Sequence, residues 1–128
     1  MITSLKEDLL KGRNIWTYCY IDGILYVMNE QWNTIALLLS QNRPTFEALG
    51  DKHRQEIIMI LAVAQRSVGE LAVEMGLSRP AVSHHIKVLK DAGLLSETKK
   101  GVRRYYQPVF TSSAESMTAL LQEIEKVS

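Results

Sequence analysis

Residues 67–95 read SVGELAVEMGLSRPAVSHHIKVLKDAGLL and contain the signals for two short helices separated by a tight turn. Ser67 and Glu70 have the spacing of a capping box, which is typical of a helix start. Gly76 is suited to the left-handed backbone that ends many helices. A second helix is predicted to begin immediately afterwards, at Ser78. Helix, three-residue turn and helix is the helix-turn-helix pattern.

The second helix of this pair leads into a predicted β-hairpin. Pro80 lies in the first helical turn, where its missing amide proton costs nothing, and Gly93 ends the helix. Strands are then expected over residues 94–98 and 102–107, joined by the Lys-Lys-Gly turn of residues 99–101. The sequence therefore predicts a mainly α protein of the α+β type, a winged helix-turn-helix with a two-stranded β-wing.

Further helices are predicted on both sides of this unit. Residues 31–40 have helical periodicity, and residues 41–44 (QNRP) are expected to break the chain. A short turn or helix is expected at residues 46–49, followed by a helix over residues 52–64 that buries its isoleucines. The last helix is predicted over residues 112–127, opened by another Ser-x-x-Glu capping box.

The segment WTYCYIDGILYVM (residues 16–28) supports two interpretations. On a helical wheel, residues 15–40 place their few polar side chains on one narrow stripe, opposite a broad apolar face. Asp22-Gly23 between two β-prone runs is, however, a strong signal for a hairpin. We prefer the helix for residues 15–29 and keep the hairpin as the alternative. Either structure exposes much apolar surface, which suggests a partner surface.

Composition fits one soluble globular domain. The chain has 128 residues, of which 46% are hydrophobic and 23% are charged, both ordinary values. The single cysteine, Cys19, cannot form an internal disulfide, which favours a cytoplasmic protein. The charged N-terminal residues do not resemble a signal peptide, and no membrane-spanning segment is predicted.

Positive charge is concentrated in one part of the chain. Residues 76–107 contain seven basic and two acidic residues, although the whole chain has a net charge of only +1. Such a cluster is typical of a surface that binds a polyanion.

On a helical wheel of the second helix, the polar arc contains Arg79, Ser83 and Lys87, with His84 at its edge, whereas His85 lies among the apolar residues. Ser78, Arg79, Ser83 and His84 are expected at base edges in the major groove, and Lys87 is expected at a phosphate. The wing supplies candidate contacts to the DNA backbone or to a minor groove: Lys99, Lys100, Arg103 and Arg104. Tyr105 and Tyr106 alternate along a strand, so one is expected to pack and the other could stack against the wing or DNA, although a structural role is preferred for both.

Residues 46–109 resemble the winged helix-turn-helix repressors of the ArsR/SmtB family. The likeness is carried by FEALGDKHRQEIIMIL, by SVGELAVEMGLSRPAVSHHIKVLKDAGLL and by KKGVRRYYQPV. It implies a homodimeric repressor that binds a palindromic operator in double-stranded DNA. It also implies three parts: residues 1–43 as an N-terminal helical extension for dimerisation, residues 44–110 as the DNA-binding domain, and residues 111–128 as a C-terminal dimerisation helix.

The family's metal ligands are not matched here. Where arsenic- and cadmium-sensing members have Glu-Leu-Cys-Val-Cys, this chain has Glu-Leu-Ala-Val-Glu at residues 70–74, so a soft metal would find no thiolate. Residues 112–128 contain no histidine, and His53 near Asp51 is interpreted as a polar pair at a helix start. No metal or cofactor site is therefore predicted. Cys19 is interpreted as a buried small side chain, with a redox role as the alternative.

Three readings of function remain to be compared. The first is a DNA-binding regulator, with a small-molecule inducer of unknown identity as an additional possibility, bound between the N-terminal aromatic residues. The second is a winged helix that binds another protein through its apolar N-terminal segment and does not read DNA. The third is an enzyme, which we do not expect because the chain has no phosphate-binding glycine loop and no positioned nucleophile and base.

Overall fold

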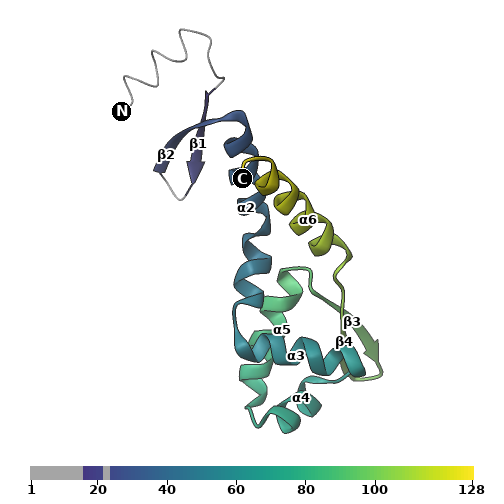
Figure 1. Cartoon of the computed structure of the whole chain (residues 1–128). Helices are drawn as coiled ribbons and strands as arrows, with labels where there is room; N and C mark the ends of the chain where they lie inside the picture. Colours follow the sequence, from purple (N-terminus) through teal and green to yellow (C-terminus); the bar gives the residue numbers. More distant parts are fainter. Residues whose placement is uncertain (1–15, 22–23) are drawn as a thin grey trace. The chain divides into compact units, whose positions relative to one another are not determined.

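The computed structural model describes residues 16–21 and 24–128, with side chains from residue 31 onwards. Their elements follow in the order β1 (Trp16–Ile21), β2 (Ile24–Asn29), α2 (Glu30–Leu49), α3 (Lys52–Val63), α4 (Val68–Met75), α5 (Arg79–Asp91), β3 (Leu95–Lys100), β4 (Arg103–Pro108) and α6 (Thr111–Lys126) (Figure 1). The chain divides into two compact units. One combines the N-terminal part up to Asn42 with residues 116–128, and the other contains residues 43–115.

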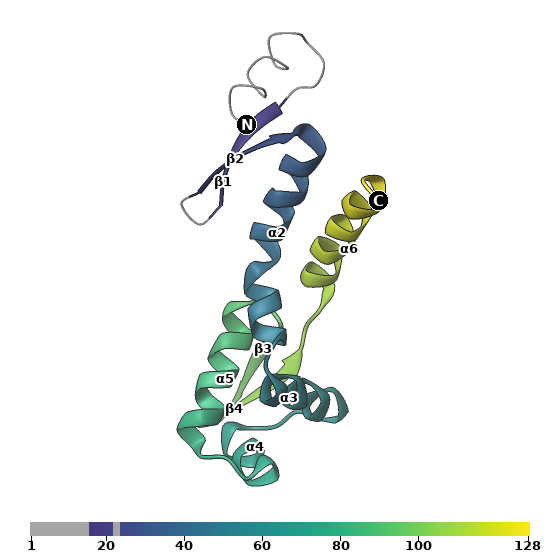
Figure 2. The ribbon, with the colours of Figure 1, turned by 60° about the vertical axis from the view of Figure 1, so that its left-hand side comes forward.

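The unit of residues 43–115 is built around the predicted helix-turn-helix. Helix α5 contacts α3, α4 and β3, and in Figure 2 it lies along the left-hand side of this unit. Its buried stripe, Val82, Ile86 and Leu89, packs into one apolar core with residues of the other elements. Those residues are Ala48, Ile57, Ile58, Leu61, Leu71, Ala72, Leu94, Leu95 and Tyr106. The expected burial of the isoleucines of α3 is confirmed for Ile57 and Ile58.

Both helices of the pair begin and end as the sequence predicts. Ser67 Oγ accepts a hydrogen bond from the backbone N–H of Glu70, and Ser78 Oγ accepts one from the N–H of Ala81. Gly76 has a φ of 65°, the left-handed conformation expected at the end of α4. These local signals fix the three-residue turn and therefore the direction in which α5 leaves it.

The wing is a two-stranded antiparallel sheet, as predicted, but its turn lies further along the chain. Lys100 pairs with Arg103, so both lysines belong to β3 and the turn is Gly101-Val102. Gly101 has a φ of 65°, a conformation that disfavours most other residues. At the base of the wing, the N–H of Tyr106 donates to the carbonyl of Arg66, which ties β4 to the segment before α4.

The preferred helical interpretation of residues 15–29 is wrong. Strands β1 and β2 form an antiparallel hairpin in which Ile21 pairs with Ile24. This register is the one that a two-residue Asp-Gly turn favours. The alternating β-branched and aromatic residues fit strands better than a helix. Cys19 and its neighbours lie outside the residues whose side chains the structure describes.

Helix α2 is longer than predicted. It continues to Leu49 with Pro44 inside it, so the expected break at residues 41–44 does not occur. Proline removes one helical hydrogen bond but does not always end a helix. Here the residues on both sides of Pro44 stay helical in spite of that loss. Asn42, which is buried, donates from Nδ2 to the carbonyls of Leu38 (2.8 Å) and of Ser116 in α6 (3.3 Å). The amide therefore connects α2 to α6.

Within residues 16–21 and 24–128, none of the helices has the length and apolar character that crossing a membrane requires.

Candidate nucleic-acid interface

The outer face of α5 carries the polar side chains that the helical wheel predicted. Arg79, Ser83, His84 and Lys87 are exposed, whereas Val82 is completely buried. Ser78 is exposed too, but its hydroxyl oxygen already caps the helix. Lys87 forms an exposed ion pair with Asp91 at 3.5 Å, a type of contact that contributes little and is easily exchanged for another anion.

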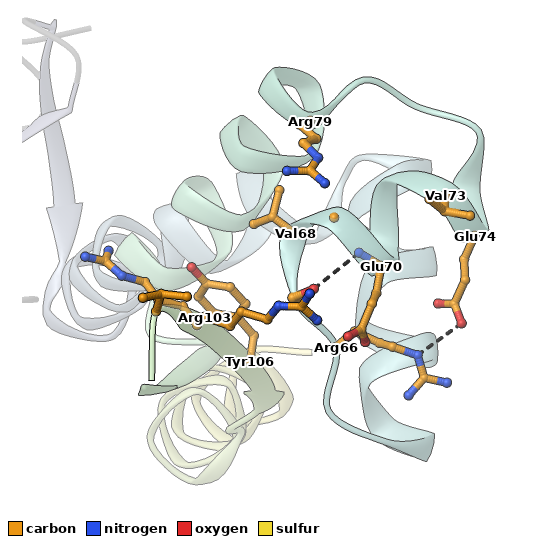
Figure 3. Close-up of a pocket in the computed structure, with 12 residues that line it drawn as sticks. Arg66, Val68, Glu70, Val73, Glu74, Arg79, Arg103 and Tyr106 are labelled. Carbon is orange, nitrogen blue, oxygen red and sulfur yellow. Dashed lines mark hydrogen bonds and ion pairs between the residues drawn. The ribbon is translucent and has the colours of Figure 1, made fainter. Parts of the chain in front are cut away.

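Arg79 lines an open groove between the helix pair and the wing. The groove has a volume of about 740 Å³, and its lining comes from α4 and the two residues before it, from the start of α5 and from the wing (Figure 3). It brings Arg79 together with Arg103 and Arg104, three of the predicted site residues. Arg66 also lines the groove, but Glu74 holds it in an ion pair at 3.0 Å.

The basic residues of the wing differ in whether a carboxylate already pairs with them. Glu97 pairs with Lys90 of α5 at 2.9 Å and with Arg104 at 3.4 Å, and it accepts a hydrogen bond from the Tyr106 hydroxyl at 3.3 Å. The hydrogen bond from Lys90 is the main reason why the pKa of Glu97 is lowered. Lys90 therefore fastens the wing to α5, and Arg104 pairs with Glu97 across the two strands of the wing, which sequence reasoning did not foresee.

The other three wing cations, Lys99, Lys100 and Arg103, have no carboxylate partner within the described part of the chain. Lys100 lies 5.4 Å from the ring centre of Tyr105 and 3.4 Å from Gln65 Oε1. Tyr106 packs in the core, which confirms that one of the two tyrosines is buried, and Tyr105 is half-buried.

The adjacent histidines lie in different surroundings, as predicted. His84 is exposed, whereas His85 is half-buried and faces α3, where its Nδ1 lies 3.3 Å from Arg54 Nη1. Burial is the main cause that lowers the pKa of His85, and the positive charge of Arg54 acts in the same direction. The His53 and His85 rings are 5.7 Å apart.

The residues that stand where metal-sensing members of the family have cysteines, Ala72 and Glu74, take part in packing and in an ion pair. Ala72 is buried in the core and Glu74 pairs with Arg66. Asp51 caps α3 by accepting from the N–H of Arg54 at 3.1 Å, which agrees with a polar pair at a helix start. Among the residues that the structure describes, no three His, Cys, Asp or Glu side chains come together in a way that could hold a metal ion.

Sequence reasoning missed two residues of this region. Gly69 lies directly against the Arg79 guanidinium, and Arg54 holds His85. Both contacts join segments that are distant in the sequence, so helical periodicity gives no signal for them.

A helix-turn-helix followed by a cationic β-hairpin defines a winged helix-turn-helix regulator, and comparison with known proteins identifies the family. Residues 51–97 match the model of the bacterial regulatory proteins of the arsR family. The transcriptional repressor SdpR of Bacillus subtilis is 32% identical over 81 residues, which cover 63% of this chain and 90% of SdpR. This chain belongs to the ArsR family.

Other relatives agree with this assignment. The transcriptional regulator Rv2034 of Mycobacterium tuberculosis is 48% identical over 62 residues, which are 48% of this chain but only 58% of Rv2034. An ArsR-like regulator from Rhodococcus sp. RHA1 has a similar structure, with a TM-score of 0.65 and 25% identity over 71% of this chain and 84% of that one. The homodimeric winged helix-turn-helix domain of Mb0332 from Mycobacterium bovis gives a TM-score of 0.56 at 28% identity, covering 71% and 83% of the two chains.

Proposed function

We propose that this protein is a cytoplasmic transcriptional repressor that binds a palindromic DNA operator as a homodimer. The observation that carries the proposal is the exposed stripe of Arg79, Ser83 and Lys87 on α5, next to a wing with exposed cations. In helix-turn-helix proteins the second helix enters the major groove with its N-terminal residues at the bases. No catalytic step is part of this proposal.

Direct base contacts are assigned to the beginning of α5. Arg79 has a guanidinium suited to the O6 and N7 atoms of guanine, and Ser83 and His84 can donate to or accept from base edges. Lys87 and the wing residues Lys99, Lys100 and Arg103 are assigned to phosphates, which fix the position of the protein but not its sequence preference. Arg104 is assigned a secondary role at the backbone because it also pairs with Glu97.

The dimer is proposed to form through α2 and α6, in agreement with the homodimeric state of Mb0332. Several large apolar side chains on these helices are exposed in the single chain: Trp32, Leu37 and Leu39 on α2, and Leu121 and Ile124 on α6. Their burial between two copies would remove apolar surface from water, which is the main driving force of association. The two recognition helices would then lie about one turn of DNA apart, roughly 34 Å.

Selection of operators from random duplex DNA tests this assignment, with wild type compared with Arg79→Ala and Lys100→Ala. We expect wild type to select a two-fold symmetric site. Arg79→Ala should relax the preference at one base position of each half-site, at a cost of about 1–3 kcal/mol. Lys100→Ala should weaken binding to all DNA sequences to the same extent. If both variants change the selected sequence in the same way, the division between bases and backbone is wrong.

Salt dependence separates this function from a winged helix that binds only proteins. If about six phosphates are neutralised per dimer, log K should fall with log salt with a slope of about −5. Binding that is absent or insensitive to salt would favour the protein-interaction module instead.

A further inference from the structure

The side chain of Arg79 lies across the backbone of Gly69 in the first turn of α4. A Cβ atom placed on Gly69 would come within 3.0 Å of Arg79 Nη2, 3.3 Å of Cζ and 3.6 Å of Nε. Real Cβ contacts are essentially never shorter than the first of these distances. In Figure 3 the guanidinium points from the start of α5 towards this turn of α4. With a side chain at residue 69, the Arg79 guanidinium would have to move from this position by a few tenths of an ångström.

No other described contact fixes the guanidinium. Arg66 is held by Glu74 and Lys90 by Glu97, but no carboxylate of the described residues pairs with Arg79. The donors of Arg79 are therefore available to an external acceptor. Their starting position is set by the surface of α4 and by the absence of a Cβ at residue 69.

The backbone gives no other reason for glycine at this position. Among the described residues, the glycines with a left-handed backbone are Gly76, Gly93 and Gly101, whereas Gly69 is an ordinary residue of α4. Glycine inside a helix is less favourable than alanine because it loses more conformational freedom on folding. The three atoms nearest to an added methyl group all belong to the Arg79 guanidinium group, the far end of a flexible side chain that can move away. The fold would therefore tolerate alanine at residue 69, and the main effect of the substitution would be to displace the Arg79 side chain.

We propose that Gly69 is a positioning residue for DNA recognition: it lets the Arg79 guanidinium lie on α4, from where it reads its base. This proposal rests on the proposed function, because it takes Arg79 as the residue that contacts a base. Holding the guanidinium in one place before binding reduces the side-chain entropy that is lost when the complex forms. A methyl group at residue 69 would move the guanidinium away from this position and so weaken the contact.

The test is a double-mutant cycle between Gly69→Ala and Arg79→Ala, measured on the operator selected by the wild-type protein. Gly69→Ala should unfold at the same temperature as wild type or higher. Its affinity for the operator should nevertheless fall by about fivefold or more, the lower end of what one good base contact contributes. It should also relax the same base position as Arg79→Ala. In the Arg79→Ala background, Gly69→Ala should change affinity by less than twofold.

Lys100→Ala provides the matched control background, because Lys100 is not among the nearest neighbours of a Cβ on Gly69 and does not line the groove. There the full loss from Gly69→Ala should persist. The proposal is overturned if Gly69→Ala binds like wild type with an unchanged base preference while Arg79→Ala relaxes it. It is also overturned if the loss from Gly69→Ala is equal in the wild-type and Arg79→Ala backgrounds, since Gly69 would then act through its own backbone. If Arg79→Ala itself leaves the base preference unchanged, the base contact that the proposed function assigns to Arg79 is wrong, and the role of Gly69 is wrong with it.

Discussion

Arg54 and His85 form a contact that links the recognition helix to the end of α2. Arg54 donates from Nε to the carbonyl of Ala48 at 2.8 Å and from Nη2 to the carbonyl of Glu47 at 3.1 Å. Its Nη1 lies 3.3 Å from His85 Nδ1. Because a guanidinium can only donate, Nδ1 must accept, and the imidazole must be neutral for this hydrogen bond. Protonation of His85 would replace the bond with a repulsion between two cations.

The stability of the protein should therefore decrease in mild acid. The pKa of His85 is lowered in the folded state by burial and by Arg54, with His53 and His84 acting in the same direction and Asp51 opposing them. Since the unfolded chain takes up the proton first, the stabilisation is complete above the unfolded pKa of about 6.5. It is lost as the pH falls below that value towards the lower folded pKa.

Denaturant unfolding at pH 7.5 and pH 5.5 checks this expectation. His85→Asn keeps an acceptor near the place of Nδ1 but cannot titrate, so its free energy of unfolding should fall less between the two pH values than that of wild type. His84→Asn is the matched control, because His84 lies on the same helix but is exposed, and it should keep the wild-type pH dependence. A His85→Asn variant as sensitive to acid as wild type would contradict the assignment.

Local signals made the helix-turn-helix and the wing predictable from the sequence. Each of the two helices has a serine at its N-terminus that accepts from an N–H three residues later, and the pattern of such a cap lies within four residues. Residues 16–29 were harder, because their apolar residues fit a helical face as well as strands. The mutual positions of Arg79 and Gly69, and of Arg54 and His85, depend on tertiary packing, which periodicity does not encode.

The wing should depend on Gly101 for its turn. Gly101 has a left-handed backbone with nothing within 4 Å of an added Cβ, so a substitution meets backbone strain but no clash. Gly101→Ala should cost about 1–2 kcal/mol at this turn. Hydrogen exchange of the wing amides should become faster, and affinity for operator and unrelated DNA should fall by a similar factor. Asparagine tolerates the left-handed region better, so Gly101→Asn should lose clearly less, and equal losses in both variants would exclude strain as the cause.

The complete regulator should require two copies of the chain, because one copy presents one recognition helix to a two-fold operator. Leu121 on α6 is 60% exposed in the single chain, and we expect it to be buried between copies. Leu121→Glu would place a charge in that apolar interface, a costly change without a partner. Its mass in light scattering should shift from a dimer towards the 14.5 kDa of one chain.

The matched control for this substitution is Val63→Glu. Val63 is 84% exposed at the end of α3, outside the helices that we assign to the dimer, so this variant should remain dimeric. Operator affinity of Leu121→Glu should fall steeply with dilution, since dimerisation must then accompany binding, whereas Val63→Glu should bind like wild type. A dimeric Leu121→Glu variant with full operator affinity would place the dimer contact on another surface and remove α6 from the assembly.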